Sequence, residues 1–322
     1  MENHPILVHH ATFSAIGENT ATINPQLIYQ SEDSVKCWLD LANSSEYRYY
    51  LEELNQISNI ISARQLDELG VCQSGVFIGP GDARKEIEIV NSIFNGRIKF
   101  NCYIVDSSEK LLELAMERYK SETGFNSTKL FVDITQIKCD IVESIRDNVD
   151  GINGPKLYTC FGNTIGNYDG LKVVERVSDL MKTGDYFVFG FHRKEKAEIS
   201  NKYSDYRSAK YKKHMVSVLR SAGFTPTDGE IEIEVLENKE NSNDIVVIKF
   251  NLIKNHRYYL NNNTRGTGRF YEIQTIIVDT SAKYDDIFVF NELARIGLVV
   301  NRFWKSDTGI NGMVLCTKND IR

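Results

Sequence analysis

Five short apolar segments recur between residues 74 and 192, and a helical pattern follows each of the first four. The segments are SGVFIG (74–79), KFNCYIVD (99–106), KLFVD (129–133), KLYTCFG (156–162) and DYFVFGFH (185–192). The helical patterns cover 82–95, 107–122, a weaker stretch near 138–148, and 170–184. Strands of about six residues that alternate with helices predict an α/β protein with a doubly wound, mostly parallel sheet.

The pattern changes outside this block. A helix is predicted over 53–70, which ends in a glycine, and a polar helix over 194–222. Residues 231–255 read as two antiparallel strands joined by a polar turn. A strand (271–278), a helix (284–297) and a closing antiparallel hairpin follow, whereas residues 1–52 show little strand pattern. We therefore expect a sheet domain of residues 53–195 and 276–322, and a smaller α+β domain of 1–52 and 196–275.

Composition excludes several classes of protein. The net charge of −6 argues against a general nucleic-acid or anionic-membrane partner. The six cysteines are widely spread and form no C-x-x-C pair, which favours reduced core thiols in a cytoplasmic protein. The chain has no 18-residue apolar stretch and no signal-peptide core. His9-His10 lacks further ligands at metal spacing, so we expect no metal.

The ends of the first three strands carry residues that suit an adenosine cofactor. Gly79-Pro80-Gly81 follows the first strand, but Arg84 stands where a dinucleotide fingerprint needs a third glycine. Asp106 ends the second strand, 27 residues after Gly79, where an acid can accept ribose hydroxyls. Asp133-Ile134 ends the third. Each feature alone also fits an ordinary turn, but together they suit S-adenosylmethionine better than NAD.

The fourth strand ends in two glycines and two asparagines, in the stretch YTCFGNTIGNYDG (158–170). Gly162 and Gly166 let the backbone approach a ligand closely, and the two amides offer donors and acceptors. Asn163 is predicted to adopt a left-handed turn conformation, and Asn167 is the candidate for touching substrate.

Three segments of the chain resemble the S-adenosylmethionine-dependent histidine Nα-methyltransferase family. They are "GPGDARK", "GNTIGN" and "ELARIGLVVNRFWKSDTGINGMVL", and the resemblance extends from Tyr29 to Cys316. It implies a Rossmann-like class I methyltransferase fold with a substrate-capping domain. It also implies S-adenosylmethionine as the cofactor and N-methylation of an amino acid.

The resemblance also implies roles for the cofactor residues. Lys85 would meet the methionine carboxylate, Asp106 the ribose, and Asp133-Ile134 the adenine edge. The cofactor residues expected in full are Gly79, Gly81, Lys85, Asp106, Asp133, Ile134 and Gly162.

On the acceptor side, the resemblance implies that Asn167 holds the backbone end of the amino acid. Tyr29 and Tyr47 would lie over the pocket. Tyr203, or its neighbour Tyr206, would bind the substrate carboxylate. Glu272 would recognise an imidazole, with Gln274 where histidine-specific members have serine.

Other departures from the family pattern concern both halves of the site. Phe77 replaces an acid before the first glycine, and Phe191-His192 replaces a Thr-Asp pair. His192 fits a general base and a satisfied structural histidine equally well. Without the resemblance, Glu272 fits a salt-bridged structural acid better than a functional one.

The sequence thus predicts an N-methyltransferase acting on the amine of a small amino acid or derivative, as a monomer or weak homo-oligomer. Histidine-specific trimethylation and a non-catalytic cofactor-binding protein are the alternatives. The acidic balance disfavours nucleic-acid methylation.

Overall fold

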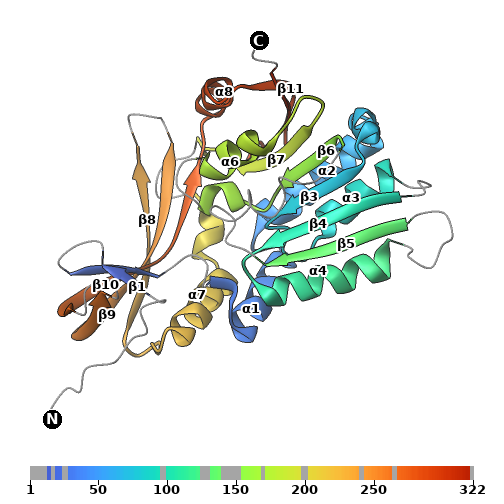
Figure 1. The fold of residues 1–322 in the computed structure, drawn as a ribbon. Coiled ribbons are helices and arrows are strands. Elements are labelled where there is room, and N and C mark those ends of the chain that lie inside the picture. Colours follow the sequence, from blue (N-terminus) through green and yellow to red (C-terminus); the bar gives the residue numbers. More distant parts are fainter. Residues whose placement is uncertain are drawn as a thin grey trace. The chain divides into compact units, whose positions relative to one another are not determined.

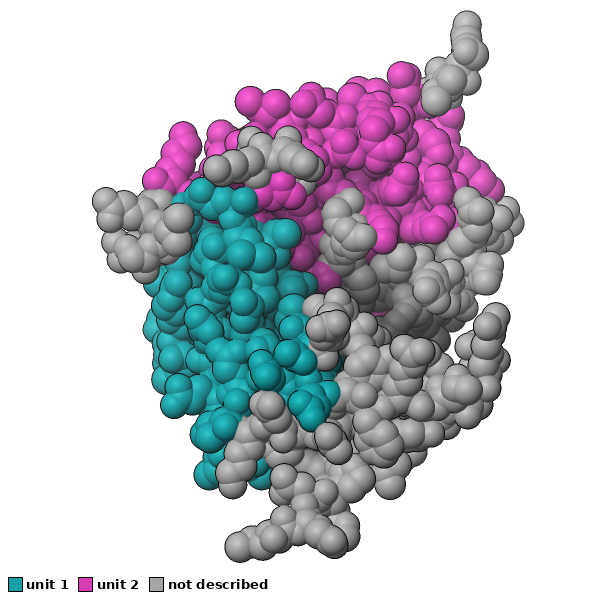
Figure 2. Space-filling view, turned by 90° about the vertical axis from the view of Figure 1, so that its left-hand side faces the viewer, with its two compact units in different colours: residues 1–47, 197–237, 245–281 teal, residues 48–196, 238–244, 282–322 magenta. Residues whose placement is uncertain are grey.

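The chain forms two compact units, which Figure 2 colours separately. The computed structural model describes residues 13–15, 19–23, 28–94, 99–123, 131–138, 154–167, 171–196, 202–238, 243–262 and 267–319. Unit 1 comprises residues 1–47, 197–237 and 245–281, and unit 2 comprises 48–196, 238–244 and 282–322. The domain boundaries expected from the sequence lay at 52, 195 and 275, close to these divisions.

Unit 2 is built on a seven-stranded sheet, whose parallel strands can be followed in Figure 1. Its strand order is β11 (Leu298–Lys305), β12 (Asn311–Lys318), β7 (Tyr186–His192), β6 (Lys156–Cys160), β3 (Ser74–Ile78), β4 (Lys99–Asp106) and β5 (Phe131–Lys138). The five strands from β7 to β5 run parallel, and β12 is antiparallel to both β7 and β11. The predicted doubly wound sheet with a closing antiparallel hairpin is confirmed.

Helices cover both faces of this sheet. One face packs against α2 (Arg48–Ser62), α3 (Arg84–Ile93) and α4 (Glu109–Glu122). The other face packs against α6 (Lys172–Leu180) and α8 (Asp286–Arg295). Every residue of β3 and β6 is buried, as a parallel sheet covered on both sides requires. Ser108 caps α4 by accepting a hydrogen bond from the Leu111 N–H.

Unit 1 contains a five-stranded sheet and two main helices. The strand order is β1 (Phe13–Ala15), β2 (Thr20–Ile23), β10 (Thr267–Lys283), β9 (Asp244–Asn262) and β8 (Gly229–Glu237). Helix α1 (Glu32–Ala42) packs against α7 (Ala209–Ser221). The predicted pair of strands across 231–255 is present as the neighbours β8 and β9.

Several predicted elements were wrong in extent. The helix expected over 194–222 is only α7, preceded by the short 3-10 helix η5 (Ser204–Arg207). The helix expected over 53–70 ends at Ser62, and a second 3-10 helix, η2 (Asp67–Val71), follows. The first 52 residues hold β1, β2 and α1, which the sequence did not reveal. The weak helix near 138–148 lies outside the described residues, except for its first residue, the end of β5.

The end of β5 was also predicted wrongly. The strand continues to Lys138, which pairs with Asp106, so that Asp133 pairs with Asn101. Asp133-Ile134 therefore lies well before the carboxyl end of its strand. The extended segment after Asp133 carries no glycine or proline that would mark a stop.

Two further findings concern the cysteines and the possibility of a membrane-spanning helix. Cys37, Cys72, Cys102, Cys160 and Cys316 are buried and form no disulfide among the described residues. None of the helices in the described ranges combines the length and the apolar character needed to span a bilayer.

The buried acid Glu86 leads to a prediction about stability. It is fully buried on α3, and no described group bonds either carboxyl oxygen. Burial raises the pKa of Glu86 from 4.5 to about 8. The native state therefore keeps a proton that the unfolded chain releases across this window. The free energy of unfolding should fall as the pH rises through it, by up to about 1.4 kcal/mol per pH unit.

Glu86→Gln should flatten this slope, as measured by urea unfolding at pH 5, 6, 7 and 8. The control is Glu88→Gln, on the same helix but half-buried. Equal slopes for wild type and Glu86→Gln would show that Glu86 does not carry the effect.

Candidate functional site

A sharp glycine turn joins β3 to α3. Gly79 and Gly81 have φ angles of 58° and 60°, in the left-handed region that glycine adopts without strain. The Gly79 N–H donates to the Val105 carbonyl at 2.8 Å, which fixes the turn to the end of β4. This turn is the predicted cofactor loop.

Asp106 lies at the end of β4 beside this loop. Its carboxylate accepts a hydrogen bond from the Ser108 N–H at 2.9 Å, and the backbone of Gly81 and Ser107 also bonds it. Burial raises the pKa of Asp106 to about 6, although these hydrogen bonds lower it. The acid predicted to bind ribose thus stands against the glycine loop.

The first turn of α3 is held by a group of charged and aromatic side chains. Asp82 accepts a hydrogen bond from the Tyr50 hydroxyl at 2.7 Å and from Arg84 Nε at 2.6 Å. Lys85 Nζ lies 4.1 Å from the centre of the Tyr50 ring, at cation–π distance. These contacts fix the direction in which Lys85 leaves the helix.

Lys85 ends in a buried ion pair that the sequence analysis missed. Its Nζ lies 2.5 Å from Glu53 Oε2 on α2, and both side chains are at most 5% exposed. The same oxygen accepts a hydrogen bond from the Gly162 N–H at 2.9 Å, at the end of β6. A Cβ atom at Gly190 on β7 would overlap Glu53 Oε1. The available signal was a glutamate on the helix face that also carries Ile57 and Ile60.

The segment after β6 contains the two asparagines. Asn163 has a φ of 64°, which confirms its predicted left-handed conformation. Its Nδ2 donates to Asn167 Oδ1 at 3.2 Å, and Asn167 itself lies in the 3-10 helix η3 (Thr164–Asn167). A Cβ atom at Gly166 would overlap Asn163 Oδ1. The bond orients the Asn167 amide so that its Nδ2, which meets no acceptor among the described residues, is left to donate.

His192 has the surroundings of a structural histidine. Its ring stacks on Tyr49, with centroids 4.0 Å apart, and its Nδ1 lies 2.9 Å from Lys283 Nζ. Burial, followed by the charges of Lys283 and Lys85, lowers the pKa of His192 well below its usual value. The ring is therefore neutral, and its Nδ1 is already occupied by the contact with Lys283 Nζ.

Unit 1 holds an aromatic cluster, which we define as Tyr29, Trp38, Tyr47, Tyr206, Tyr211 and His214. Trp38 makes edge contacts with Tyr29 and Tyr47, at centroid distances of 5.6 and 5.7 Å. Tyr47 also meets Tyr206 at 6.4 Å. The structure thus brings together the predicted residues Tyr29 and Tyr47, and adds Trp38 and His214 to them. Tyr203 is fully buried with a φ of 55°, directly before η5.

Two polar residues of β10 contact the hydroxyl groups of this cluster. Tyr206 and Ser281 share a hydrogen bond of 2.9 Å between their hydroxyls, and Tyr211 donates to Asp279 Oδ2 at 3.1 Å. Burial raises the pKa values of Tyr206 and Tyr211 well above the ordinary value, so both phenols stay protonated.

The structure does not bring Glu272 or Gln274 to these contacts. Both side chains are exposed on β10. Glu272 precedes Asp279 by seven residues, or about 23 Å along an extended strand. An acid followed two positions later by serine, the spacing associated with the histidine-specific members, occurs at Asp279-Thr280-Ser281 instead. The sequence analysis did not use this spacing and predicted Glu272 with Gln274 instead.

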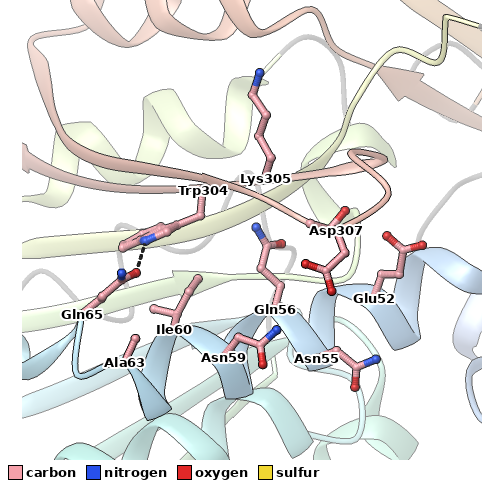
Figure 3. A pocket seen from close by; sticks show the side chains of 11 residues that line it. Glu52, Asn55, Gln56, Asn59, Ile60, Ala63, Gln65, Trp304, Lys305 and Asp307 are labelled. Carbon is pink, nitrogen blue, oxygen red and sulfur yellow. Dashed lines mark hydrogen bonds between the residues drawn. The ribbon is translucent and has the colours of Figure 1, made fainter.

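A separate pocket of about 300 Å³ lies between α2 and the turn that joins β11 to β12 (Figure 3). Trp304 Nε1 donates to Gln65 Oε1 across one side of it. Its lining comprises Glu52, Asn55, Gln56, Asn59, Ile60, Ala63, Gln65, Trp304, Lys305, Ser306 and Asp307. None of the predicted site residues is among them.

A family model described as "Histidine-specific methyltransferase, SAM-dependent" matches residues 9–318. The chain belongs to this family. It is therefore an S-adenosylmethionine-dependent methyltransferase, as the sequence predicted, and its sheet has the expected class I order. No curated protein matches the chain.

Solved structures similar to this methyltransferase share little sequence with it. The magnesium protoporphyrin IX methyltransferase ChlM of Synechocystis PCC 6803, with bound SAH, is 9% identical. The match covers 89% of this chain and 95% of that one, with a TM-score of 0.48. DesVI of Streptomyces venezuelae is 10% identical, with coverages of 89% and 98% and a TM-score of 0.43. The glycopeptide N-methyltransferase MtfA, complexed with SAM, is 10% identical, with coverages of 82% and 94% and a TM-score of 0.43.

The residues of unit 2 fit S-adenosylmethionine chemically. The left-handed glycine turn, the Asp106 carboxylate and the Lys85 ammonium offer a close backbone, a hydroxyl acceptor and a carboxylate partner, respectively. Among the described residues, no group of three or more His, Cys, Asp or Glu could hold a metal ion.

The pKa of Asp106 predicts how cofactor binding depends on pH. An acid that accepts ribose hydroxyls is strongest as a carboxylate, so affinity for S-adenosylhomocysteine should fall as the pH drops through about 6. Calorimetry between pH 5 and 8 measures this. Asp106→Asn should bind more weakly, by about 10-fold at pH 8, and lose most of the dependence. An unchanged pH profile in Asp106→Asn would exclude Asp106 as its source.

Proposed function

We propose that this methyltransferase N-methylates the α-amine of a free amino acid, with histidine the first acceptor to test. Membership of a family described as histidine-specific supports the acceptor class. The observation that carries the proposal is the pairing of Asp279 and Ser281 with the buried hydroxyls of Tyr211 and Tyr206. Such a polar group within aromatic surroundings suits a small ring that carries N–H donors.

When bound, S-adenosylmethionine supplies a methyl group on a positively charged sulfur. The protein's task is then to hold a neutral amine in line with that carbon. Proximity and orientation can lower such a barrier by about 7–11 kcal/mol. The lowered pKa of His192 makes it a weak base and its Nδ1 is engaged by Lys283, so the proposal assigns it no proton abstraction.

Asn167 is proposed to hold the carboxylate of the acceptor. The Asn163 amide donates to Asn167 Oδ1. The other polar group of the Asn167 side chain is its Nδ2, which can only donate a hydrogen bond. Asn167 is half-buried, which leaves part of its side chain accessible to a ligand. Gly166 provides the space for this arrangement, because a Cβ atom there would overlap Asn163 Oδ1.

The aromatic cluster is proposed to hold the methylated amine. Tyr29 and Tyr47 were the tyrosines predicted to lie over the pocket, and ring faces attract cationic amines by about 0.5–2 kcal/mol each. Asp279 with Ser281, rather than Glu272 with Gln274, is proposed to read the acceptor's side chain. We further propose that the enzyme works in the cytoplasm on small molecules, as a monomer or weak homo-oligomer.

The direct test is incubation with labelled S-adenosylmethionine and a panel of amino acids and biogenic amines that includes histidine. Label in histidine, located on the α-nitrogen by mass spectrometry, would support the proposal. If no amine is labelled while S-adenosylhomocysteine still binds, the protein is a cofactor-binding protein and the proposal fails.

Asn167→Ala should weaken the acceptor far more than the cofactor. We expect the acceptor KM to rise by about 10- to 100-fold, because a hydrogen bond to a charged group is lost. The Kd for S-adenosylhomocysteine should change by less than about 2-fold. Steady-state kinetics and calorimetry give the two numbers, and equal losses in both would remove Asn167 from the acceptor site.

Asp279→Asn tests which of two acids, Asp279 or Glu272, recognises the side chain of the acceptor. It should raise KM for histidine by about 10-fold or more, through loss of a charge-assisted hydrogen bond. Glu272→Gln, on the same strand but exposed, is the matched control and should leave KM unchanged. The reverse result would return the role to Glu272.

A further inference from the structure

The Lys85–Glu53 pair lies at the corner where the glycine loop, α2 and the end of β6 meet. Glu53 Oε2 receives both Lys85 Nζ and the Gly162 N–H, at 2.5 and 2.9 Å. A carboxylate can accept about four hydrogen bonds, and among the described residues no donor meets Oε1. Glu53 can therefore accept a further hydrogen bond. It lies beside Lys85 and Gly162, two residues expected to bind the cofactor.

Two other described acids near this corner, Asp82 and Glu86, do not pair with Lys85. Asp82 is bound by Tyr50 and Arg84. Glu86 is fully buried without a hydrogen-bonding partner. The end of β3 supplies no acid, because Phe77 lies there, packed against Tyr119 in the core. Glu53 is thus the acid that pairs with Lys85 at this corner.

The cofactor presents two opposite charges at its amino-acid end. An α-carboxylate that approached Lys85 alone would form a minus–plus–minus arrangement with Glu53. The α-ammonium group removes this conflict if it lies beside Glu53, since each charge then faces its opposite. The Lys85–Glu53 pair and the amino-acid end of the cofactor each have no net charge, and in this arrangement their opposite charges face each other.

We propose that Glu53 binds the α-ammonium group of S-adenosylmethionine while Lys85 binds its α-carboxylate, so that the buried pair selects the zwitterion. This rests on the proposed role of Lys85 at the methionine carboxylate. In this arrangement Glu53 on α2 supplies an acid, whereas the end of β3, where the family pattern has one, carries Phe77.

The wild-type protein allows a test that needs no variant. Calorimetry compares S-adenosylhomocysteine, its analogue with hydrogen in place of the α-amino group, and 5′-methylthioadenosine, which lacks the whole amino-acid end. Loss of a charged partner at a buried site should weaken the deaminated analogue by at least about 30-fold. A loss below about 3-fold would overturn the proposal.

Glu53→Gln separates recognition of the ammonium group from positioning of Lys85. The proposal expects the roughly 30-fold preference for S-adenosylhomocysteine over its deaminated analogue to shrink to about 3-fold or less. Affinity for 5′-methylthioadenosine should stay within about 2-fold. If Glu53 only positions Lys85, both amino-acid ligands weaken together and the preference persists, which would refute the proposal.

Two controls complete the design. Glu52→Gln removes the same charge from the adjacent residue, which accepts from the Thr308 hydroxyl at 2.5 Å, and should keep the preference. If Glu53→Gln does not fold, the double variant Lys85→Met/Glu53→Met replaces the pair with apolar side chains, an exchange that proteins often tolerate. A preserved preference in it would again refute the proposal.

The outcomes also separate this inference from the proposed function. Failure of the wild type to bind S-adenosylhomocysteine would contradict the methyltransferase activity itself. Labelled histidine together with an unchanged preference in Glu53→Gln would leave that function intact and remove Glu53 from the ammonium site.

Discussion

The buried ion pair between Lys85 and Glu53 connects the elements that form the carboxyl edge of the unit 2 sheet. Removing one member of such a pair typically costs about 3–5 kcal/mol, because the other charge stays buried and unpaired. The pair spans α2 and α3, and its carboxylate also takes the Gly162 N–H at the end of β6. The positions of these three elements at this edge are therefore coupled through one carboxylate.

Glycines provide the space for polar side chains at this edge. Gly190 on β7 leaves room for Glu53, and Gly166 leaves room for the Asn163 amide. A methyl group at either place would overlap a polar side-chain atom. Their lack of a side chain, rather than a left-handed backbone, is what the site uses at these two positions.

The core of the fold was predictable from the sequence because its signals are local. The strands of unit 2 are continuous apolar runs of the length that a sheet buried on both faces requires. Turn glycines at 79, 81 and 162, and Asp106, stand next to those runs, so their positions followed directly. The end of β5 was missed because no turn residue marks it, and α7 was overextended because η5 shares its polar composition.

The residues that the sequence did not reveal depend on contacts between distant segments. Glu53 is 32 residues from Lys85 and 109 from Gly162. Asp279 becomes recognisable only through Tyr211, 68 residues earlier. Helical and strand periods identify a buried face but not the partner of a polar group on it. An acid on an apolar face was the only local sign of Glu53.

The aromatic cluster of unit 1 and the Lys85–Glu53 corner of unit 2 differ in the charge of their ionisable groups. In unit 1, burial keeps Tyr47, Tyr206 and Tyr211 protonated by raising their pKa values, and lowers the pKa of His214 to about 4. These groups are neutral near pH 7. Unit 2 instead carries a buried pair of charges at Lys85 and Glu53. Fixed charges suit a cofactor whose amino-acid end is zwitterionic. Neutral rings and hydroxyls can orient an amine without the strong ion pair that would stabilise its protonated form before methyl transfer.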